Sequence, residues 1–361
     1  MKVHSIDVSP LTYKLKHPFV FSGVRLEQLE YAIIRVQSEA GAIGYGECPA
    51  YWEPRGETQA STITAVKHVK EMFIEKEFLS PERWGETLPK LLPNAYAAAC
   101  GLDIAFHDVL GQEEGKPVST HYGVAKPVPV EAAIPMVTEQ ETEVLLVEAM
   151  AQGITTYKVK VGIDTEREYR LLQQVRSAIG QDATLFVDVN QGWKTVDAAK
   201  RALERFSAVS LAWVEQPLPT SSSNENFREL FEATNIPVML DESTYVAADV
   251  DAAVQQGGVK LFNIKLAKAG GIWGAHAFAR KAALNDAQYM LGSMIEGALG
   301  TYAGLHFAAT HNVRTTASNA FTFIDDEKAF GPTVKDGFME VPTRPGLGYE
   351  YPQRFAACFS V

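Results

Sequence analysis

Charged residues recur through the middle of the chain at a nearly constant spacing, each at the end of a run that predicts a β-strand. Five positions carry this pattern: Lys160, Asp188, Glu215, Asp241 and Lys265. The intervals between consecutive members are 28, 27, 26 and 24 residues, which is the length of one strand–helix–strand repeat. A solvated surface would not place one acid or base at the same end of each successive strand. We therefore interpret the five positions as parts of one site.

The three acids of this series predict a divalent metal site. Carboxylates at the ends of adjacent strands would repel one another strongly unless a cation lay between them. Carboxylate oxygens and water are the ligands that hard divalent cations prefer. We therefore predict a Mg²⁺ site at Asp188, Glu215 and Asp241, with Mn²⁺ as a possible replacement. Taken singly, each acid would more often be structural, for example as the cap of the next helix.

Two lysines flank the acids, on strands that a barrel would place on opposite sides. Lys160 and Lys265 could therefore approach a metal-bound carboxylate from its two faces. Removal of a proton α to a carboxylate forms an enolate dianion, which a divalent cation stabilises. A lysine acting as base needs a pKa lowered from about 10.4 toward roughly 7–8. We predict that Lys160 is this base, and that Lys158, on the same strand face, lowers its pKa and neutralises the substrate.

The elements that must position these residues begin near residue 128. Short β-branched runs alternate there with amphipathic helical runs, in seven clear repeats and a weaker eighth at VRTTASNA (313–320). This alternation predicts a (β/α)₈ barrel, in which chemistry collects at the carboxyl ends of the strands. An open doubly wound sheet is the alternative, although no GxGxxG or GxxxxGK[ST] motif follows a strand. Residues 1–50 read as strands and residues 58–115 as helices, which together predict a small α+β domain.

Composition excludes several classes of partner. The formal net charge of −11 argues against nucleic acid and anionic membrane surfaces. The three cysteines are far apart and form no CxxC pair, as expected for reduced thiols rather than a disulfide framework. Neither a signal peptide nor a run of about 20 apolar residues is present. We therefore expect a cytoplasmic protein with a small-molecule carboxylate as its partner.

Five motifs occur in an order and spacing that resemble the enolase superfamily, and within it the two-lysine, muconate-lactonizing subgroup. They are KVK (158–160), DVNQGW (188–193), VEQP (214–217), LDES (240–243) and NIKLAKAGG (263–271). The resemblance covers nearly the whole chain, including GYGE (44–47) and PGLG (345–348). A mandelate-racemase-type member would carry a histidine at the end of the seventh strand, where this chain has YMLGSMIEG (289–297).

The resemblance implies a fold and a set of roles. The fold is an α/β, modified TIM barrel of (β/α)₇β type under an N-terminal α+β capping domain. We place the capping domain at 1–125, the barrel at 126–328, and a C-terminal segment that packs back on the capping domain at 329–361. Lys160 and Lys265 would be the acid/base pair, and the three acids the Mg²⁺ ligands. A homo-oligomer is expected by the same analogy.

The activity implied is that of a Mg²⁺-dependent isomerase, related to dipeptide epimerases, N-acylamino acid racemases or muconate cycloisomerases. A dehydratase of the o-succinylbenzoate synthase type shares every residue named so far, and a metal-binding barrel without catalysis is a remote alternative. Residues expected to bind substrate or to support the site are Lys158, Asn190, Glu242, Arg25, Met294, Glu296 and Asn319.

Substrate choice is expected to depend on four segments: 21–29, 50–57, 293–297 and 315–321. Within them, Arg25 and Arg55 could neutralise a second acidic group, and Tyr51 and Trp52 could form an apolar wall. Related dipeptide epimerases carry Asp-x-Asp after the last strand to hold the substrate ammonium group. This chain has Ser-Asn-Ala at 318–320, which disfavours a dipeptide with a free amino group.

Overall fold

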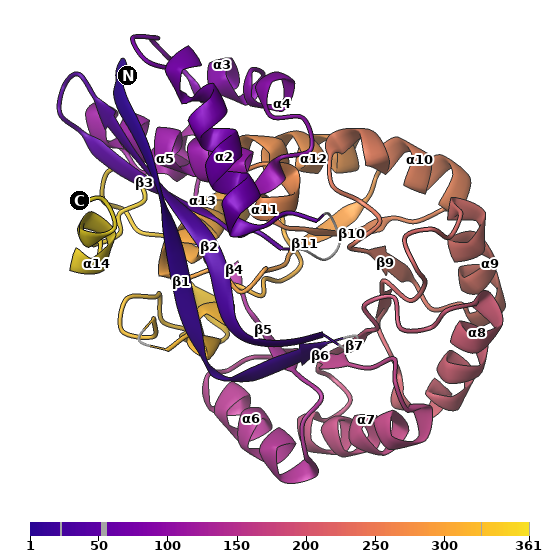
Figure 1. Cartoon of the computed structure of the whole chain (residues 1–361). Coiled ribbons are helices and arrows are strands. Elements are labelled where there is room, and N and C mark those ends of the chain that lie inside the picture. The colour runs from indigo at the N-terminus through magenta and orange to yellow at the C-terminus, as the bar shows by residue number, and fades with distance from the viewer. Residues whose placement is uncertain (22–23, 52–55, 326, 361) are drawn as a thin grey trace.

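The computed structural model describes residues 1–21, 24–51, 56–325 and 327–360. Its larger part is a curled sheet of parallel strands with helices on the outside (Figure 1). The strand order is β11-β10-β9-β8-β7-β6-β5, so each strand lies beside its neighbours in sequence, as in a (β/α) barrel. The strands are β5 (Glu131–Ile134), β6 (Thr156–Lys160), β7 (Thr184–Asp188), β8 (Val214–Glu215), β9 (Val238–Leu240), β10 (Leu261–Ile264) and β11 (Gln288–Leu291).

Thr316 closes the ring between the two edge strands. It forms parallel bridges to Leu291, at the end of β11, and to Val130, next to β5, and the Glu131 amide donates to the Thr316 carbonyl at 2.9 Å. The predicted eighth strand over 313–320 is therefore wrong in extent. The Ser318 amide donates to Thr316 Oγ1 at 3.1 Å, and such local bonds compete with a strand ladder. The closed ring excludes the open doubly wound sheet.

Helices cover the outside of the ring, as the alternating pattern predicts. Asp164 caps α7, with Oδ1 accepting the amides of Glu166 and Arg167 at 3.1 Å. The buried face of this helix includes Leu172 and Val175, which pack toward the strands. The barrel helices are α6 (Glu139–Ala151), α7 (Thr165–Ile179), α8 (Val196–Arg205), α9 (Asn224–Thr234), α10 (Ala247–Gly257), α11 (Leu266–Ala269), α12 (Ile272–Leu284) and α13 (Ala298–Thr310).

The inside of the ring has an apolar layer beneath a charged layer. Phe186, Trp213, Met239 and Met290 form one buried cluster, in which the Phe186 and Trp213 rings stack with centroids 4.4 Å apart. Side chains two apart on a strand share a face. Phe186 and Asp188 therefore both point into the ring, as do Trp213 and Glu215, and Met239 and Asp241. The apolar layer is thus the floor on which the charged residues stand.

The N-terminal part forms an antiparallel sheet, β1-β2-β3, with helices packed on it. Its strands are β1 (Val3–Phe21), β2 (Val24–Ser38) and β3 (Ile43–Cys48), and its helices are α2 (Gln59–Val69), α3 (Pro81–Gly85), α4 (Leu88–Leu91) and α5 (Tyr96–Glu114). β3 lies directly on α5, because Gly46 and Gly101 carry no side chains: a Cβ on Gly46 would stand 1.8 Å from the Gly101 carbonyl oxygen. The long β1–β2 arm extends across the face of the barrel (Figure 1).

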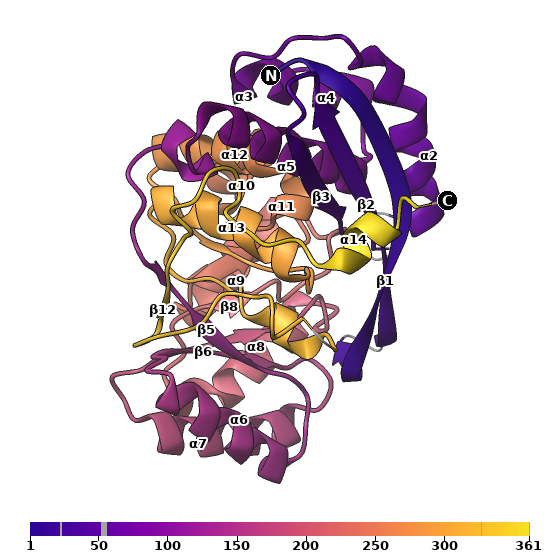
Figure 2. The same ribbon diagram turned by 90° about the vertical axis from the view of Figure 1, so that its left-hand side faces the viewer.

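The chain after residue 327 returns to the N-terminal sheet. The last helix, α14 (Gln353–Ala357), lies beside β1 and β2 (Figure 2), where Ser9 Oγ donates to the Cys358 carbonyl at 2.7 Å. Tyr45 of β3 packs against Tyr351 and Phe355. β12 (Phe338–Met339) pairs with β4 (Val128–Pro129). Among the described residues, no helix combines the length and apolar character needed to cross a bilayer.

Asp103 joins the N-terminal part to the barrel. From α5, its Oδ2 accepts the amides of Ile272 at 2.5 Å and Trp273 at 3.2 Å, which are the first residues of barrel helix α12. Its Oδ1 accepts from Trp84 Nε1 at 2.9 Å. The carboxylate thus caps a helix of one unit from a helix of the other.

We expect Asp103→Ala to lower the free energy of unfolding by about 3 kcal/mol, because it leaves buried donors of Trp84, Ile272 and Trp273 without an acceptor. Asp103→Asn keeps one oxygen acceptor and should lose less. Urea unfolding followed by circular dichroism measures both values. An Ala variant within about 0.5 kcal/mol of wild type would contradict the assigned link.

Candidate functional site

A cavity of about 330 Å³ opens at the carboxyl ends of the barrel strands. Lys160, Asp241 and Lys265 line it from the barrel, and Phe19 and Tyr51 line it from the N-terminal part. The strand order places β7, β8 and β9 between β6, which ends at Lys160, and β10, which ends just before Lys265. The lysines therefore reach one cavity from opposite sides, with the acids between them.

Lys160 is held by the next strand. Lys160, Asp188 and Glu215 are in register across β6, β7 and β8. Lys160 Nζ lies 2.6 Å from Asp188 Oδ2 and donates to Asn190 Oδ1 at 2.6 Å. The backbone amide of Asn190 donates to Asp188 Oδ1 at 3.0 Å. Asn190 itself has a left-handed backbone conformation, with φ +43°. Both oxygens of Asp188 thus accept a hydrogen bond.

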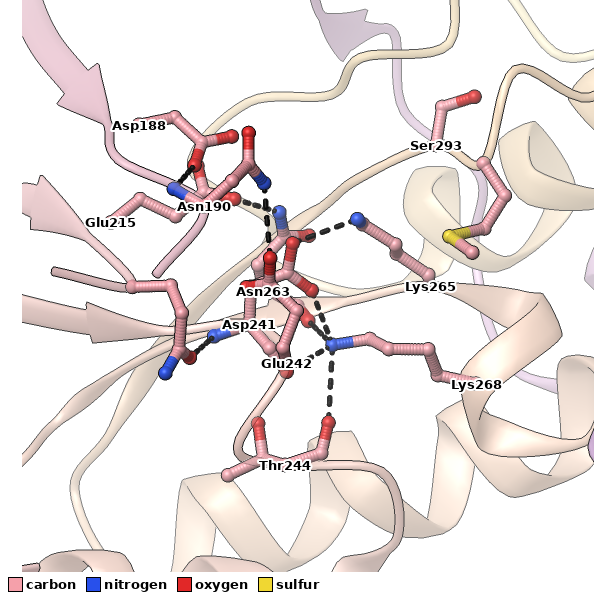
Figure 3. Close-up of polar contacts among 12 residues, drawn as sticks. Asp188, Asn190, Glu215, Asp241, Glu242, Thr244, Asn263, Lys265, Lys268 and Ser293 are labelled. Carbon is pink, nitrogen blue, oxygen red and sulfur yellow. Dashed lines mark hydrogen bonds and ion pairs between the residues drawn. The ribbon is translucent and has the colours of Figure 1, made fainter. Parts of the chain in front are cut away.

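Asp241 lies between two lysines on the far side of the cavity (Figure 3). Its Oδ2 is 2.7 Å from Lys265 Nζ, and its Oδ1 is 2.6 Å from Lys268 Nζ. Burial alone would raise the pKa of Asp241, but the two ammonium groups outweigh it and hold this pKa well below its usual range. Burial lowers the pKa of Lys265, but Asp241, Glu242 and Glu215 outweigh it, so the pKa is raised. The three neighbouring acids therefore favour the ammonium form of Lys265.

Glu215 is the least compensated of the three acids. Asn263 Nδ2 donates to its Oε1 at 2.6 Å, whereas its fully buried Oε2 accepts no hydrogen bond from the described residues. The Lys158 ammonium group lies 3.8 Å from Oε2. Burial and the charge of Asp188 raise the pKa of Glu215 well above its usual range. An orphaned, buried carboxylate oxygen between Asp188 and Asp241 fits a bound divalent cation.

Asp188, Glu215 and Asp241 do not converge on one point in this structure. In the ranges that the structure describes, no three acidic, histidine or cysteine side chains converge as a ready metal site. The reason is electrostatic: Asp188 turns to Lys160, and Asp241 turns to Lys265 and Lys268. Ammonium groups thus supply the positive charge that these buried carboxylates require.

Lys158 does not act as an isolated charge beside Lys160. Its Nζ lies 2.8 Å from Glu131 Oε1 on β5 and 5.8 Å from the centre of the Phe186 ring. Burial lowers the pKa of Lys158, but Glu131 and Glu215 outweigh it and the pKa is raised. Glu131 therefore balances the charge of Lys158, for which the sequence predicts a role only toward Lys160 and the substrate.

Glu242 follows Asp241 and lines the same cavity. It accepts from Asn190 Nδ2 at 3.0 Å, so a chain of contacts runs from Lys160 through Asn190 to Glu242. Burial and the neighbouring Asp241 and Asp188 raise the pKa of Glu242 to about 7. This carboxyl therefore carries a proton for part of the time near neutral pH.

The other predicted residues lie at various distances from the cavity. Met294 lines it, while Glu296 turns away to accept the Met294 amide at 2.9 Å. Asn319 donates to the Glu131 carbonyl at 3.0 Å and supports β5 rather than lining the cavity. Arg25 is exposed, lies 3.4 Å from Glu27 and is not among the residues that line the cavity. Trp52 and Arg55 lie outside the described residues.

Four residues of the site were not predicted from the sequence. Lys268 contacts Asp241, Asn263 contacts Glu215, Glu131 contacts Lys158, and Gln216 Oε1 accepts the Asp241 amide at 3.0 Å. The role of Asn263 could have been predicted from the sequence, because it precedes Lys265 by two residues and therefore lies on the same strand face. The sequence position of Lys268, past the end of its strand, gave no indication that it turns back to Asp241.

Comparisons with known proteins agree with this geometry. Residues 5–123 match the model of the mandelate racemase/muconate lactonizing enzyme N-terminal domain, and residues 141–354 match the enolase C-terminal domain-like model. An N-succinyl-L-Arg/Lys racemase of Bacillus cereus is 26% identical, with 97% of this chain and 95% of that protein covered. A hydrophobic dipeptide epimerase of Enterococcus faecalis is 30% identical, with 90% of this chain and 91% of that protein covered.

A solved structure gives the same result. The dipeptide epimerase of Methylococcus capsulatus, complexed with Mg and the dipeptide L-Arg-D-Lys, superposes with a TM-score of 0.89. It is 27% identical, and the match covers 97% of this chain and 100% of that one. The two matched domains together span most of the sequence. The chain therefore belongs to the mandelate racemase/muconate lactonizing enzyme family and is an enzyme of the enolase superfamily.

Proposed function

We propose that the protein is a Mg²⁺-dependent racemase or epimerase, which inverts the α-carbon of an amino-acid derivative by way of an enolate. The observation that carries this proposal is the placement of Lys160 and Lys265 at opposite sides of one cavity. Inversion needs a base on one face of the α-carbon and an acid on the other. Two ammonium/amine groups separated by the acids supply both.

The reaction is a transfer of one proton out and one proton in. The free amine of one lysine takes the α-proton and becomes an ammonium group, and the ammonium group of the other lysine donates a proton to the opposite face. The two lysines end in exchanged protonation states. The product stereoisomer therefore finds a free amine on the face that carries its α-proton, and the reverse reaction can proceed by the same steps. Lys160 and Lys265 must therefore differ in protonation before each turnover.

Mg²⁺ would be held by Asp188, Glu215 and Asp241, and the orphaned Glu215 Oε2 supports this assignment. The cation, when bound, would stabilise the negative charge that develops on the substrate carboxylate. Mn²⁺ accepts the same oxygen ligands. A cation on Asp241 would compete with the Lys265 contact of 2.7 Å and would remove the interaction that raises the pKa of Lys265. Lys268, bound to the Asp241 carbonyl at 2.5 Å, would remain in place.

The α-nitrogen of the substrate is expected to be acylated. N-succinyl amino acids and the C-terminal residue of dipeptides, named for the relatives above, share a carboxylate whose α-carbon bears an amide nitrogen. A dipeptide adds a free ammonium group, which requires a nearby acid. Ala317 and Ala320 line the cavity, and residues 317–320 carry no acid. Lys194, which donates to the Gln191 carbonyl at 3.0 Å, adds positive charge to the lining. These observations favour an N-acyl, and above all an N-succinyl, amino acid.

A homo-oligomer and a cytoplasmic location are part of the same proposal and rest on the family analogy. Light scattering coupled to size-exclusion chromatography would measure the oligomeric state directly.

Replacing one lysine should abolish inversion and leave proton exchange on one enantiomer only. In D₂O with Mg²⁺, Lys160→Ala should exchange the α-proton of one enantiomer of an N-succinyl amino acid, and Lys265→Ala that of the other. Each variant should lower racemisation at least about 10³-fold, because general acid–base catalysis supplies about 10²–10⁴-fold per group. Proton NMR follows exchange, and polarimetry follows inversion.

Lys200→Ala, which removes a half-buried lysine paired with Glu229 away from the cavity, is the matched control and should retain wild-type rates. Unchanged racemisation in Lys160→Ala would overturn the mechanism. Formation of o-succinylbenzoate from its precursor would instead establish the dehydratase, and lactone formation from muconate would establish the cycloisomerase. A wild-type protein that binds Mg²⁺ but exchanges no α-proton from any of these compounds would indicate a barrel without catalysis.

Metal removal should abolish exchange reversibly. Treatment with EDTA should stop α-proton exchange, and Mg²⁺ should restore it. Glu215→Gln keeps the shape of the side chain but removes its charge, and should weaken Mg²⁺ binding at least about tenfold by isothermal titration calorimetry. Glu229→Gln makes the same charge change at an exposed site and should leave Mg²⁺ affinity unchanged. Equal affinities in Glu215→Gln and wild type would place the cation elsewhere.

Substrate preference should follow the charge of the N-substituent. We expect kcat/KM for N-succinyl amino acids to exceed that for dipeptides by at least about tenfold, since no described acid at 317–320 receives an ammonium group. Lys194→Gln should reduce the preference for succinyl over acetyl by about twofold to fivefold, the usual worth of an exposed charge pair. A higher kcat/KM for dipeptides would show that an acid elsewhere in the chain binds their ammonium group.

A further inference from the structure

The turn between β11 and α13, at residues 292–297, has an unusual backbone. Ile295 has a φ of +61°, in the left-handed region that β-branched residues very rarely adopt. It is buried and lines the catalytic cavity together with Ser293 and Met294. Ser293 lies on the same side of the site as Lys265 (Figure 3). Strained backbone of this kind persists only where surrounding contacts hold it.

Some of the holding contacts come from within the turn. Ser293 Oγ accepts the Ile295 amide at 2.8 Å, and Glu296 Oε2 accepts the Met294 amide at 2.9 Å. Ser293 Oγ also donates to Glu296 Oε2. These bonds define a compact turn, but all their members move together with it. They cannot by themselves fix its position relative to the opposite wall of the cavity.

Other contacts come from the N-terminal β1-β2-β3 sheet, here called the capping sheet, which lies more than 200 residues away in the chain. Tyr31, on β2, donates its hydroxyl to the Met294 carbonyl at 2.5 Å. Glu47, on β3, accepts the amides of Gly297 at 2.8 Å and Gly300 at 3.1 Å. Tyr31 is 1% exposed and Glu47 is 0% exposed, so solvent cannot replace either contact. The two residues bracket Ile295, one on the residue before it and the other two residues after it.

We propose that Tyr31 and Glu47 are positioning residues for the substrate: they hold Ile295 in its strained conformation, and Ile295 is thereby a specificity-determining wall of the cavity on the side of Lys265. The capping domain thus shapes the barrel wall through buried contacts as well as by its loops. Glu327, just before the C-terminal segment, accepts the Ala298 amide at 2.6 Å and steadies the start of α13. The reaction to which this wall contributes is the racemisation proposed above.

The inference makes a prediction about two substitutions combined. Ile resists a positive φ, whereas Gly adopts it without penalty. Loss of the Tyr31 hydroxyl should therefore matter when residue 295 is Ile and matter little when it is Gly. Tyr31→Phe should raise KM for N-succinyl-L-phenylalanine about threefold to tenfold, as expected if only a tenth to a third of the molecules keep the wall in place, with kcat nearly unchanged. In an Ile295→Gly background, Tyr31→Phe should change KM less than about twofold.

Tyr157→Phe is the matched control. Tyr157 also donates a buried hydroxyl to a backbone carbonyl, that of Ile154 at 2.7 Å, but it does not line the cavity. It should leave KM and kcat near their wild-type values. Glu47→Gln keeps the size of the side chain and one oxygen acceptor, and should raise KM less than Glu47→Ala does. This rescue by the conservative variant separates a positioning role from a general loss of packing.

A second readout does not depend on turnover. In full-length protein labelled with ¹³C at the isoleucine δ1-methyl groups, Tyr31→Phe and Glu47→Ala should shift or broaden the Ile295 resonance, and Tyr157→Phe should not. Titration of N-succinyl-L-phenylalanine against that resonance gives a Kd, which should rise together with KM. An unmoved Ile295 resonance would overturn the proposal, and so would a moved resonance with unchanged KM and Kd. If wild type neither binds nor exchanges any N-acyl amino acid, the proposed function fails, while the resonance still decides whether Tyr31 and Glu47 hold the turn.

Discussion

Negative charge buried at the carboxyl ends of the strands is the constraint on which the rest of the site depends. Glu131, Asp188, Glu215 and Asp241 are each at most 1% exposed, and isolated buried carboxylates are strongly disfavoured. Four ion pairs of 2.8 Å or less bring Lys158, Lys160, Lys265 and Lys268 to three of these carboxylates, those of Glu131, Asp188 and Asp241. Lys160 and Lys265, which are proposed for catalysis, therefore also balance the buried charge of Asp188 and Asp241. A cation bound to these two acids would compete with both lysines for them.

The barrel makes this charge tolerable by separating it from the apolar core. Each of the three acids has an apolar residue two positions before it: Phe186, Trp213 and Met239. Because side chains two apart on a strand share a face, the apolar layer lies directly beneath the charged layer. Packing of the lower layer gives the upper layer a rigid base. Rigid support matters because proton transfer depends on small differences in distance between the base and the α-carbon.

The capping sheet completes the cavity in two ways. Phe19 and Tyr51 line it directly, and Tyr31 and Glu47 hold a turn of the barrel from behind. Helix α5, which packs on this sheet, is in turn anchored to α12 by Asp103. A substitution in the capping sheet can therefore alter the active-site wall without any contact with the substrate.

The amino-acid sequence by itself determined the barrel, the family and the identity of the acids and lysines. This was possible because each of those features is local: a strand end, a phase of about 26 residues, a motif of three to nine residues. The turn at 38–41 between β2 and β3 and the Asp164 cap of α7 are local in the same sense. The metal ligands and the domain boundaries remain predictions.

Only the tertiary structure decided which charge pairs with which. Lys158 was expected to act on Lys160, but Glu131 from the neighbouring strand balances it. Lys268 turns back to Asp241, and the closing strand is reduced to bridges at Thr316. Tyr31 reaches Met294 across 263 residues of sequence. No local pattern encodes such contacts, because they depend on which distant side chains the packed barrel and capping sheet bring within a hydrogen-bond length.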